Sequence, residues 1–111
     1  MKLKTFVIES QRWTANMGWG NGYVVIPEGH PLHKIHYNDL YDKHDFSVNG
    51  GITWSEMAGG LKDEPDFVQP TDWIIGFDTA HFNDSLAKWP DADSVKKEAR
   101  RLAAQIEILY P

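Results

Sequence analysis

The chain has 111 residues, with 11 Lys and Arg against 16 Asp and Glu, and a net charge of −5. This length suits one domain, residues 1–111. The acidic balance argues against a binder of nucleic-acid polymers, since such proteins cluster Lys and Arg to neutralise phosphates. The chain has no cysteine, which excludes disulfides and a cysteine nucleophile. No apolar stretch approaches the roughly 20 residues that span a membrane, so we expect a cytoplasmic protein.

Tryptophan is unusually frequent, with five in the chain. One small core rarely hides five indoles, because each N–H group needs an acceptor. We therefore expect some of them to line a pocket or an interface; the alternative is that they lie half-buried around a small sheet. The tryptophans are Trp13, Trp19, Trp54, Trp73 and Trp89.

The first half of the chain predicts short strands separated by turns. Residues 3–14 begin as a strand, and Tyr23–Ile26 is the next, because β-branched and aromatic residues favour strands. Asn21-Gly22 between them is typical of a turn, since both residues tolerate positive φ. Residues 27–45 are rich in Pro, Gly and His and predict a structured loop, with a short helical turn at residues 37–42.

Further along, residues 46–48 and 52–54 predict two strands joined by a kink at Asn49-Gly50-Gly51. Residues 57–71 predict a loop with two prolines, and residues 73–78 predict another strand.

A C-terminal helix follows Pro90. Asp91, Asp93 or Ser94 can cap its first turn. One apolar stripe at helical spacing contains Val95, Ala99, Leu102, Ala103, Ile106 and Leu109. The fold class is therefore α+β: a small, mainly antiparallel sheet of four or five strands with this one helix packed on one face. The other face is left to water, a ligand or a second subunit.

Three polar groups follow the predicted strand at residues 73–78. In Asp78-x-x-His81-x-x-Asp84, a spacing of three brings side chains together if the segment turns helically. The group could cap local turns, bind a ligand together with the aromatic Trp73 and Phe77, or hold a metal or act in acid–base catalysis. Strand alternation predicts that Asp78 emerges on the face opposite Phe77.

Two other segments are candidate ligand sites. His30, His33 and His36 have the spacing of a metal loop, but Pro31 disfavours a regular helix through them, so a loop that folds over a ligand is the alternative. Asn49-Gly50-Gly51, followed by Thr53 and Trp54, offers backbone N–H groups that suit an anion. A glycine bulge that curves the sheet is the alternative there.

Three motifs together resemble a family of small uncharacterised proteins of bacteriophages and prophages. The motifs are Gly22-Tyr-Val-Val-Ile-Pro-Glu-Gly-His-Pro31, Val48-Asn-Gly-Gly-Ile-Thr-Trp54 and Trp73-Ile-Ile-Gly-Phe-Asp-Thr-Ala-His-Phe-Asn-Asp84. The family often has His at the position of Asn49 and Cys at the position of Thr79, which speaks against an essential catalytic group there. The resemblance implies a protein of the bacterial host cytoplasm that could sequester a nucleotide-derived signal of bacterial immunity.

The sequence therefore predicts a non-catalytic protein that binds a small polar or nucleotide-derived ligand as a homo-oligomer, without cofactor or metal. Aromatic rings would stack on a base, which is worth roughly 1–3 kcal/mol per base. A small metal-dependent hydrolase and a protein–protein inhibitor of a host factor remain alternatives. The predicted ligand-binding residues are Tyr23, His30, His33, Asn49, Gly50, Gly51, Thr53, Trp54, Trp73, Phe77, Asp78, His81 and Asp84.

Overall fold

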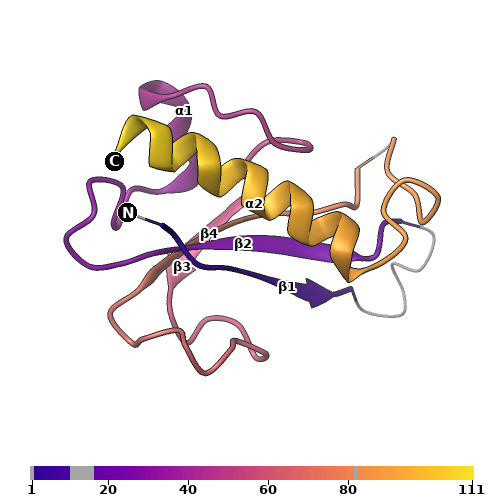
Figure 1. Ribbon diagram of the computed structural model, residues 1–111, viewed down its shortest axis with the longest axis horizontal. Helices are drawn as coiled ribbons and strands as arrows, with labels where there is room; N and C mark the ends of the chain where they lie inside the picture. Colours follow the sequence, from indigo (N-terminus) through magenta and orange to yellow (C-terminus); the bar gives the residue numbers. More distant parts are fainter. Residues whose placement is uncertain (1, 11–16, 82) are drawn as a thin grey trace.

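The structure, a computed structural model, describes residues 2–10, 17–81 and 83–111; Trp13 and Phe82 lie outside these ranges. Four strands form one sheet in the order β1-β2-β4-β3, and each neighbouring pair is antiparallel. Within the described ranges, two helices complete the fold (Figure 1). The α+β prediction is thus confirmed. The elements are β1 (Thr5–Glu9), β2 (Gly20–Ile26), α1 (Tyr37–Lys43), β3 (Trp54–Met57), β4 (Trp73–Phe77) and α2 (Ala92–Leu109).

The prediction of a turn at Asn21-Gly22 is wrong. Both residues lie inside β2, where Asn21 pairs with Ile8 and Gly22 pairs with both Val7 and Phe77. A glycine is needed here because there is no room for a side chain: a Cβ on Gly22 would lie 2.4 Å from the Phe77 ring. The ring of Tyr23 crosses in the same way over Gly76, its partner on β4, on the other face of the sheet.

The predicted strands at residues 46–48 and 52–54 are also corrected. β3 begins only at Trp54 and runs to Met57, and residues 46–48 are not in a strand. Val48 and Ile52 are apolar because they are buried in the core under α2. Between them, Gly50 and Gly51 adopt positive φ, and the Gly51 N–H donates to the Val48 carbonyl, which closes a turn. Core burial rather than sheet pairing explains this apolar pattern.

Both helices begin at well-defined caps. The predicted turn at residues 37–42 is α1, whose first turn is capped by the His36 side chain. In α2, Asp91 and Ser94 form a reciprocal capping box. The predicted stripe is buried from Val95 to Ile106, whereas Leu109 is 48% exposed. Among the residues that the structure describes, no helix has the length and apolarity needed to cross a membrane.

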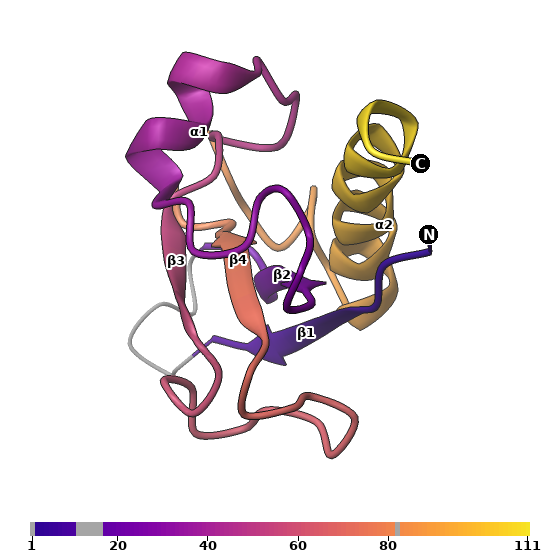
Figure 2. The same cartoon turned by 90° about the vertical axis from the view of Figure 1, so that its left-hand side faces the viewer.

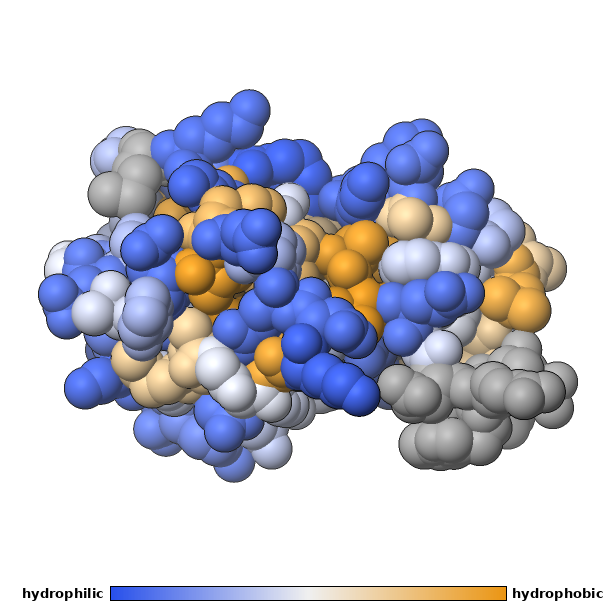
Figure 3. Space-filling model, turned by 90° about the horizontal axis from the view of Figure 1, so that it is seen from below, coloured by the Kyte–Doolittle hydropathy of each residue, from blue (hydrophilic) through white to orange (hydrophobic). Residues whose placement is uncertain are grey.

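Different parts of the chain cover the two faces of the sheet. The larger core lies between the sheet and α2 and contains Phe77. On the opposite face, Phe6, Tyr23, Val25 and Ile74 form a second cluster, and Ala58, Leu61 and Val68 from the β3–β4 connection pack against it. Figure 2 shows α2 on one side of the sheet and this connection below it. Seen from below, apolar surface is exposed in separate patches among hydrophilic residues (Figure 3).

The aromatic ring that covers Gly22 yields the first prediction. Gly22→Ala should lower the free energy of unfolding by about 1–3 kcal/mol, the usual cost of overpacking a core, because the new methyl group would overlap the Phe77 ring. Urea denaturation measures this. In the Phe77→Leu background the same glycine change should cost much less, since the ring atoms are gone. An equal cost in both backgrounds would contradict this explanation.

Candidate functional site

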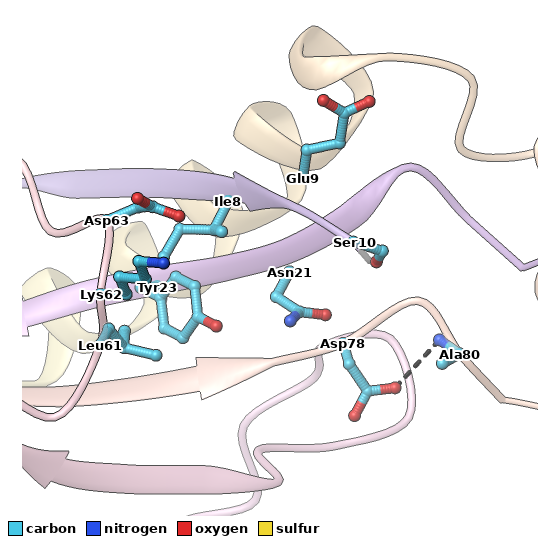
Figure 4. Close-up of a pocket in the computed structure, with 10 residues that line it drawn as sticks. All are labelled: Ile8, Glu9, Ser10, Asn21, Tyr23, Leu61, Lys62, Asp63, Asp78 and Ala80. Atoms are coloured by element: carbon cyan, nitrogen blue, oxygen red, sulfur yellow. Dashed lines mark hydrogen bonds between the residues drawn. The ribbon is translucent and has the colours of Figure 1, made fainter. Parts of the chain in front are cut away.

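A groove of about 370 Å³ lies on the sheet face opposite α2. Its floor comes from β1 and β2, one wall from the β3–β4 connection, and its far end from the residues that follow β4. Figure 4 shows Tyr23 and Asn21 between the connection and Asp78. The lining residues are Ile8, Glu9, Ser10, Asn21, Tyr23, Leu61, Lys62, Asp63, Asp78 and Ala80.

A second hollow of about 190 Å³ adjoins the groove. Thr53 and Trp54 line it, and it shares Asn21, Tyr23 and Asp78 with the groove. The Trp54 ring meets the Tyr23 ring edge to face, with centroids 5.6 Å apart. The two hollows thus form one depression with aromatic side chains in its floor.

The wall formed by the β3–β4 connection is braced by Glu64. Its carboxylate accepts hydrogen bonds from the N–H groups of Gly59 (2.8 and 2.9 Å) and Leu61 (3.0 Å). Gly59 adopts a φ of +96°, which glycine tolerates without strain. The closed loop presents Leu61, Lys62 and Asp63 to the groove.

Tyr23 is 5% exposed and forms the apolar floor. Burial raises the pKa of its phenol; a hydrogen bond with Asn21 lowers it, and the charge of Asp78 raises it further. The net shift is upward, so the hydroxyl group keeps its proton at neutral pH and can both donate and accept.

Asp78 stands where the groove meets the polar residues after β4. As predicted, it emerges opposite Phe77, since Phe77 is in the core under α2 and Asp78 lines the groove. One carboxylate oxygen accepts from the Thr53 hydroxyl (3.0 Å) and the other from the Ala80 N–H (3.0 Å). The second oxygen also lies 3.4 Å from His81 Nδ1. Asp78 and His81 therefore belong to one site.

Asp84 has a structural role within the same cluster. It is 7% exposed, and its carboxylate accepts hydrogen bonds from the His81 backbone N–H, His81 Nδ1, Asn49 Nδ2 and Trp89 Nε1, all between 2.9 and 3.1 Å. Burial raises the pKa of this carboxyl, but the hydrogen bonds from His81, Asn49 and Trp89 outweigh it and hold the pKa below the ordinary value. Because the ionised carboxylate only accepts, His81 Nδ1 carries a proton.

Asp78, His81 and Asp84 are also the group that could hold a metal. Within the described part of the chain, one ligand atom from each lies within 4.8 Å of the others. A cation bound there would displace the Nδ1 proton of His81 and compete with the donors that Asp84 already satisfies. Zinc sites use three or four converging protein ligands, so the number of ligands here would be sufficient. The competition with internal donors is what makes this donor set a poor fit to a tightly bound metal.

The turn at Asn49-Gly50-Gly51 binds groups of the protein itself. The Asn49 N–H donates to Glu98 Oε2 of α2 at 2.8 Å, and the Gly51 N–H donates within the turn. Gly50 is covered by the His81 ring, which a Cβ there would meet at 2.1 Å. Two of the N–H groups predicted to bind an anion thus have internal acceptors.

Three of the remaining predicted residues, His30, His33 and Trp73, line neither hollow. His30 Nδ1 accepts from the Leu32 N–H, and His33 Nε2 lies 2.7 Å from the Thr71 carbonyl oxygen. The Trp73 indole donates to the Ile35 carbonyl. Phe77 borders the second hollow, but its side chain is buried in the core under α2. Burial lowers the pKa of His30, and so does His33. These side chains support the fold around the site.

Of the ten residues that line the groove, the sequence predicted two, Tyr23 and Asp78. Ile8 and Glu9 end β1 and Ser10 follows it, while Leu61, Lys62 and Asp63 belong to a segment predicted only as a loop. Asn21 was assigned to a turn and so was not considered as a lining residue. Strand alternation could have placed Ile8 beside Phe6, but nothing in the sequence indicates that the β3–β4 connection folds back over the sheet.

Comparisons of the chain with protein-family models, with curated proteins and with solved structures gave no match. The resemblance to small phage proteins therefore stays a prediction.

The Asp84 cluster yields the second prediction. Asp84→Asn should lower the free energy of unfolding at pH 7 by about 2–4 kcal/mol, because the new amide group meets buried donors where the carboxylate accepted them. Since folding lowers the Asp84 pKa, the stability it confers is present above the pKa of the unfolded chain, about 4. It is lost as the pH falls through the folded-state pKa.

The gap between wild type and Asp84→Asn should therefore narrow below about pH 4, as measured by urea denaturation at a series of pH values. Asp45→Asn, a change at an exposed position, serves as the control and should leave stability nearly unchanged. A gap of constant size across the pH series would contradict the role given to the ionised carboxylate.

Proposed function

We propose that this protein binds a small organic ligand in the groove and does not transform it. The observation that carries the proposal is the groove itself, which joins an apolar floor to several polar side chains. Its volume of about 370 Å³ falls in the ordinary range of ligand pockets. Tyr23 and Trp54 supply the aromatic surface, while Asn21 and Asp78 supply hydrogen-bonding groups.

The charges around the groove bear on the nucleotide-derived ligand that the sequence predicts. A base could pack against the apolar floor, but phosphates would face the carboxylates of Asp63 and Asp78. Among the lining residues that the structure describes, Lys62 is the one cation. The backbone turn expected to take phosphate already holds Glu98. Nucleosides are therefore better candidates than nucleotides.

Binding without chemistry fits the bonding of the polar groups. His81 is held by a hydrogen bond to Asp84 and does not line the groove. It would therefore not contact a molecule bound there. The one acidic group of the cluster that reaches the groove is Asp78, which is itself held by Thr53 and Ala80. This arrangement suits a fixed recognition group.

A blocked groove provides the test. Ala80 is exposed and lines the groove, so Ala80→Trp should fill its far end. Ala87→Trp makes the same change at an exposed position outside the groove and serves as the matched control. A panel of nucleosides, cyclic nucleotides, ADP-ribose, NAD and aromatic amines would be screened by thermal shift and followed by calorimetry.

A ligand of the groove should bind wild type and Ala87→Trp equally and should bind Ala80→Trp more weakly by about tenfold or more, equivalent to about 1.4 kcal/mol. Binding that Ala80→Trp leaves unchanged would place the ligand elsewhere and overturn the proposal. So would a panel in which no compound binds.

A further inference from the structure

We infer that the ligand carries a cationic nitrogen that binds the Asp78 carboxylate, with its apolar or aromatic body over Tyr23. The inference rests on the proposed function, because it assigns a ligand class to the same groove. Amines, guanidines and protonated heterocycles belong to this class, and anionic ligands do not.

The first argument is the difference between Asp78 and Asp84. A carboxylate has about four lone-pair sites. In Asp84 they are all committed to internal donors, and the side chain is 2% exposed. Asp78 accepts one hydrogen bond on each oxygen, His81 Nδ1 lies 3.4 Å from one of them, and the side chain is 32% exposed. Asp78 can therefore take further donors from a molecule in the groove.

The second argument is that Asp78 is held in place. Thr53 comes from the start of β3 and Ala80 from the segment after β4, and each binds a different carboxylate oxygen. The carboxylate thus has a defined orientation before a ligand arrives. A charge-assisted hydrogen bond to such a group loses little side-chain entropy on binding.

The third argument is the charge of the lining residues that the structure describes. Asp63 adds negative charge at the side of the groove formed by the β3–β4 connection. Figure 4 shows Asp63 beside Ile8 and Lys62, whereas the Glu9 carboxylate points away from Tyr23 and Asn21, toward α2. Lys62 is exposed and ends a flexible chain, so its ammonium group can swing into water when a ligand enters. Clefts lined by one sign of charge concentrate ligands of the opposite sign.

The floor of the groove specifies the rest of the ligand. Ile8, Tyr23 and Leu61 present apolar surface beside the acidic end. The Tyr23 ring cannot turn away, because it is packed between Phe6, at a centroid distance of 4.9 Å, and Trp54. A flat or aliphatic body next to a charged nitrogen matches this surface.

Three compounds with one ring and different end groups test the inference. Tyramine carries an ammonium group, tyrosol a hydroxyl group and 4-hydroxyphenylacetate a carboxylate. Calorimetry and ligand-observed NMR at low salt would compare them on the wild-type protein. Tyramine should bind about fivefold more tightly than tyrosol, the upper end expected of one partly exposed ion pair, and 4-hydroxyphenylacetate should bind most weakly.

Two variants identify the carboxylate responsible. Asp78→Asn should reduce the preference of tyramine over tyrosol to about twofold or less, and Asp45→Asn outside the groove should leave it unchanged. Circular dichroism would establish that Asp78→Asn is folded. Should that variant unfold, Asp63→Asn at an exposed position offers a second measurement, and it should lower the preference by a smaller factor.

The outcomes separate this inference from the proposed function. If tyrosol binds as tightly as tyramine, and both are blocked by Ala80→Trp, the groove binds ligands but its preference for cations is refuted. If the preference survives in Asp78→Asn, the role of Asp78 is refuted. If none of the three compounds binds while a nucleoside or another neutral compound is blocked by Ala80→Trp, only the ligand class is wrong.

Discussion

The carboxylate of Asp84 joins three parts of the chain that strand pairing does not connect. It receives donors from the turn before β3, from the segment after β4 and from Trp89 ahead of α2. Such a group is costly to bury unless its oxygens are satisfied, and here several donors satisfy them together. The position of Asp78 follows from this anchor, because Asp84 holds His81 and the turn at Asn49 against the end of β4. The groove thus has one polar end fixed by buried hydrogen bonds.

Two contacts between an aromatic ring and a glycine on the neighbouring strand fix the floor of the groove relative to the core. Phe77 crosses Gly22 on the face under α2, and Tyr23 crosses Gly76 on the opposite face. The same pair of adjacent strands therefore carries a core aromatic on one face and the groove floor on the other. Because side chains alternate along a strand, the burial of Phe77 under α2 forces Asp78 onto the face where Tyr23 lies.

Much of this fold could be predicted from local patterns. Helical spacing and the capping residues identified α2, and alternation in residues 73–78 placed Phe77 and Asp78 on opposite faces. The wrong predictions share one cause. Residues that make tertiary contacts were interpreted as evidence for a local turn or strand. Gly22 makes space for Phe77, and Val48 and Ile52 are buried by α2 rather than paired in a sheet. The wall made by Leu61–Asp63 could not be predicted, since its position depends on where the sheet ends.

In the sequence pattern Asp78-x-x-His81-x-x-Asp84 the two carboxylates are equivalent. Their surroundings in the structure give them different roles. Asp84 meets donors on every side and has become part of the scaffold, with a pKa held below its ordinary value. Asp78, three residues before His81, is fixed by only two hydrogen bonds and faces the groove. An acidic residue that is both immobilised and incompletely satisfied is suited to recognise a donor from outside the protein. His81, between the two, also has a structural role, since its Nδ1 proton points to Asp84 and its ring covers Gly50.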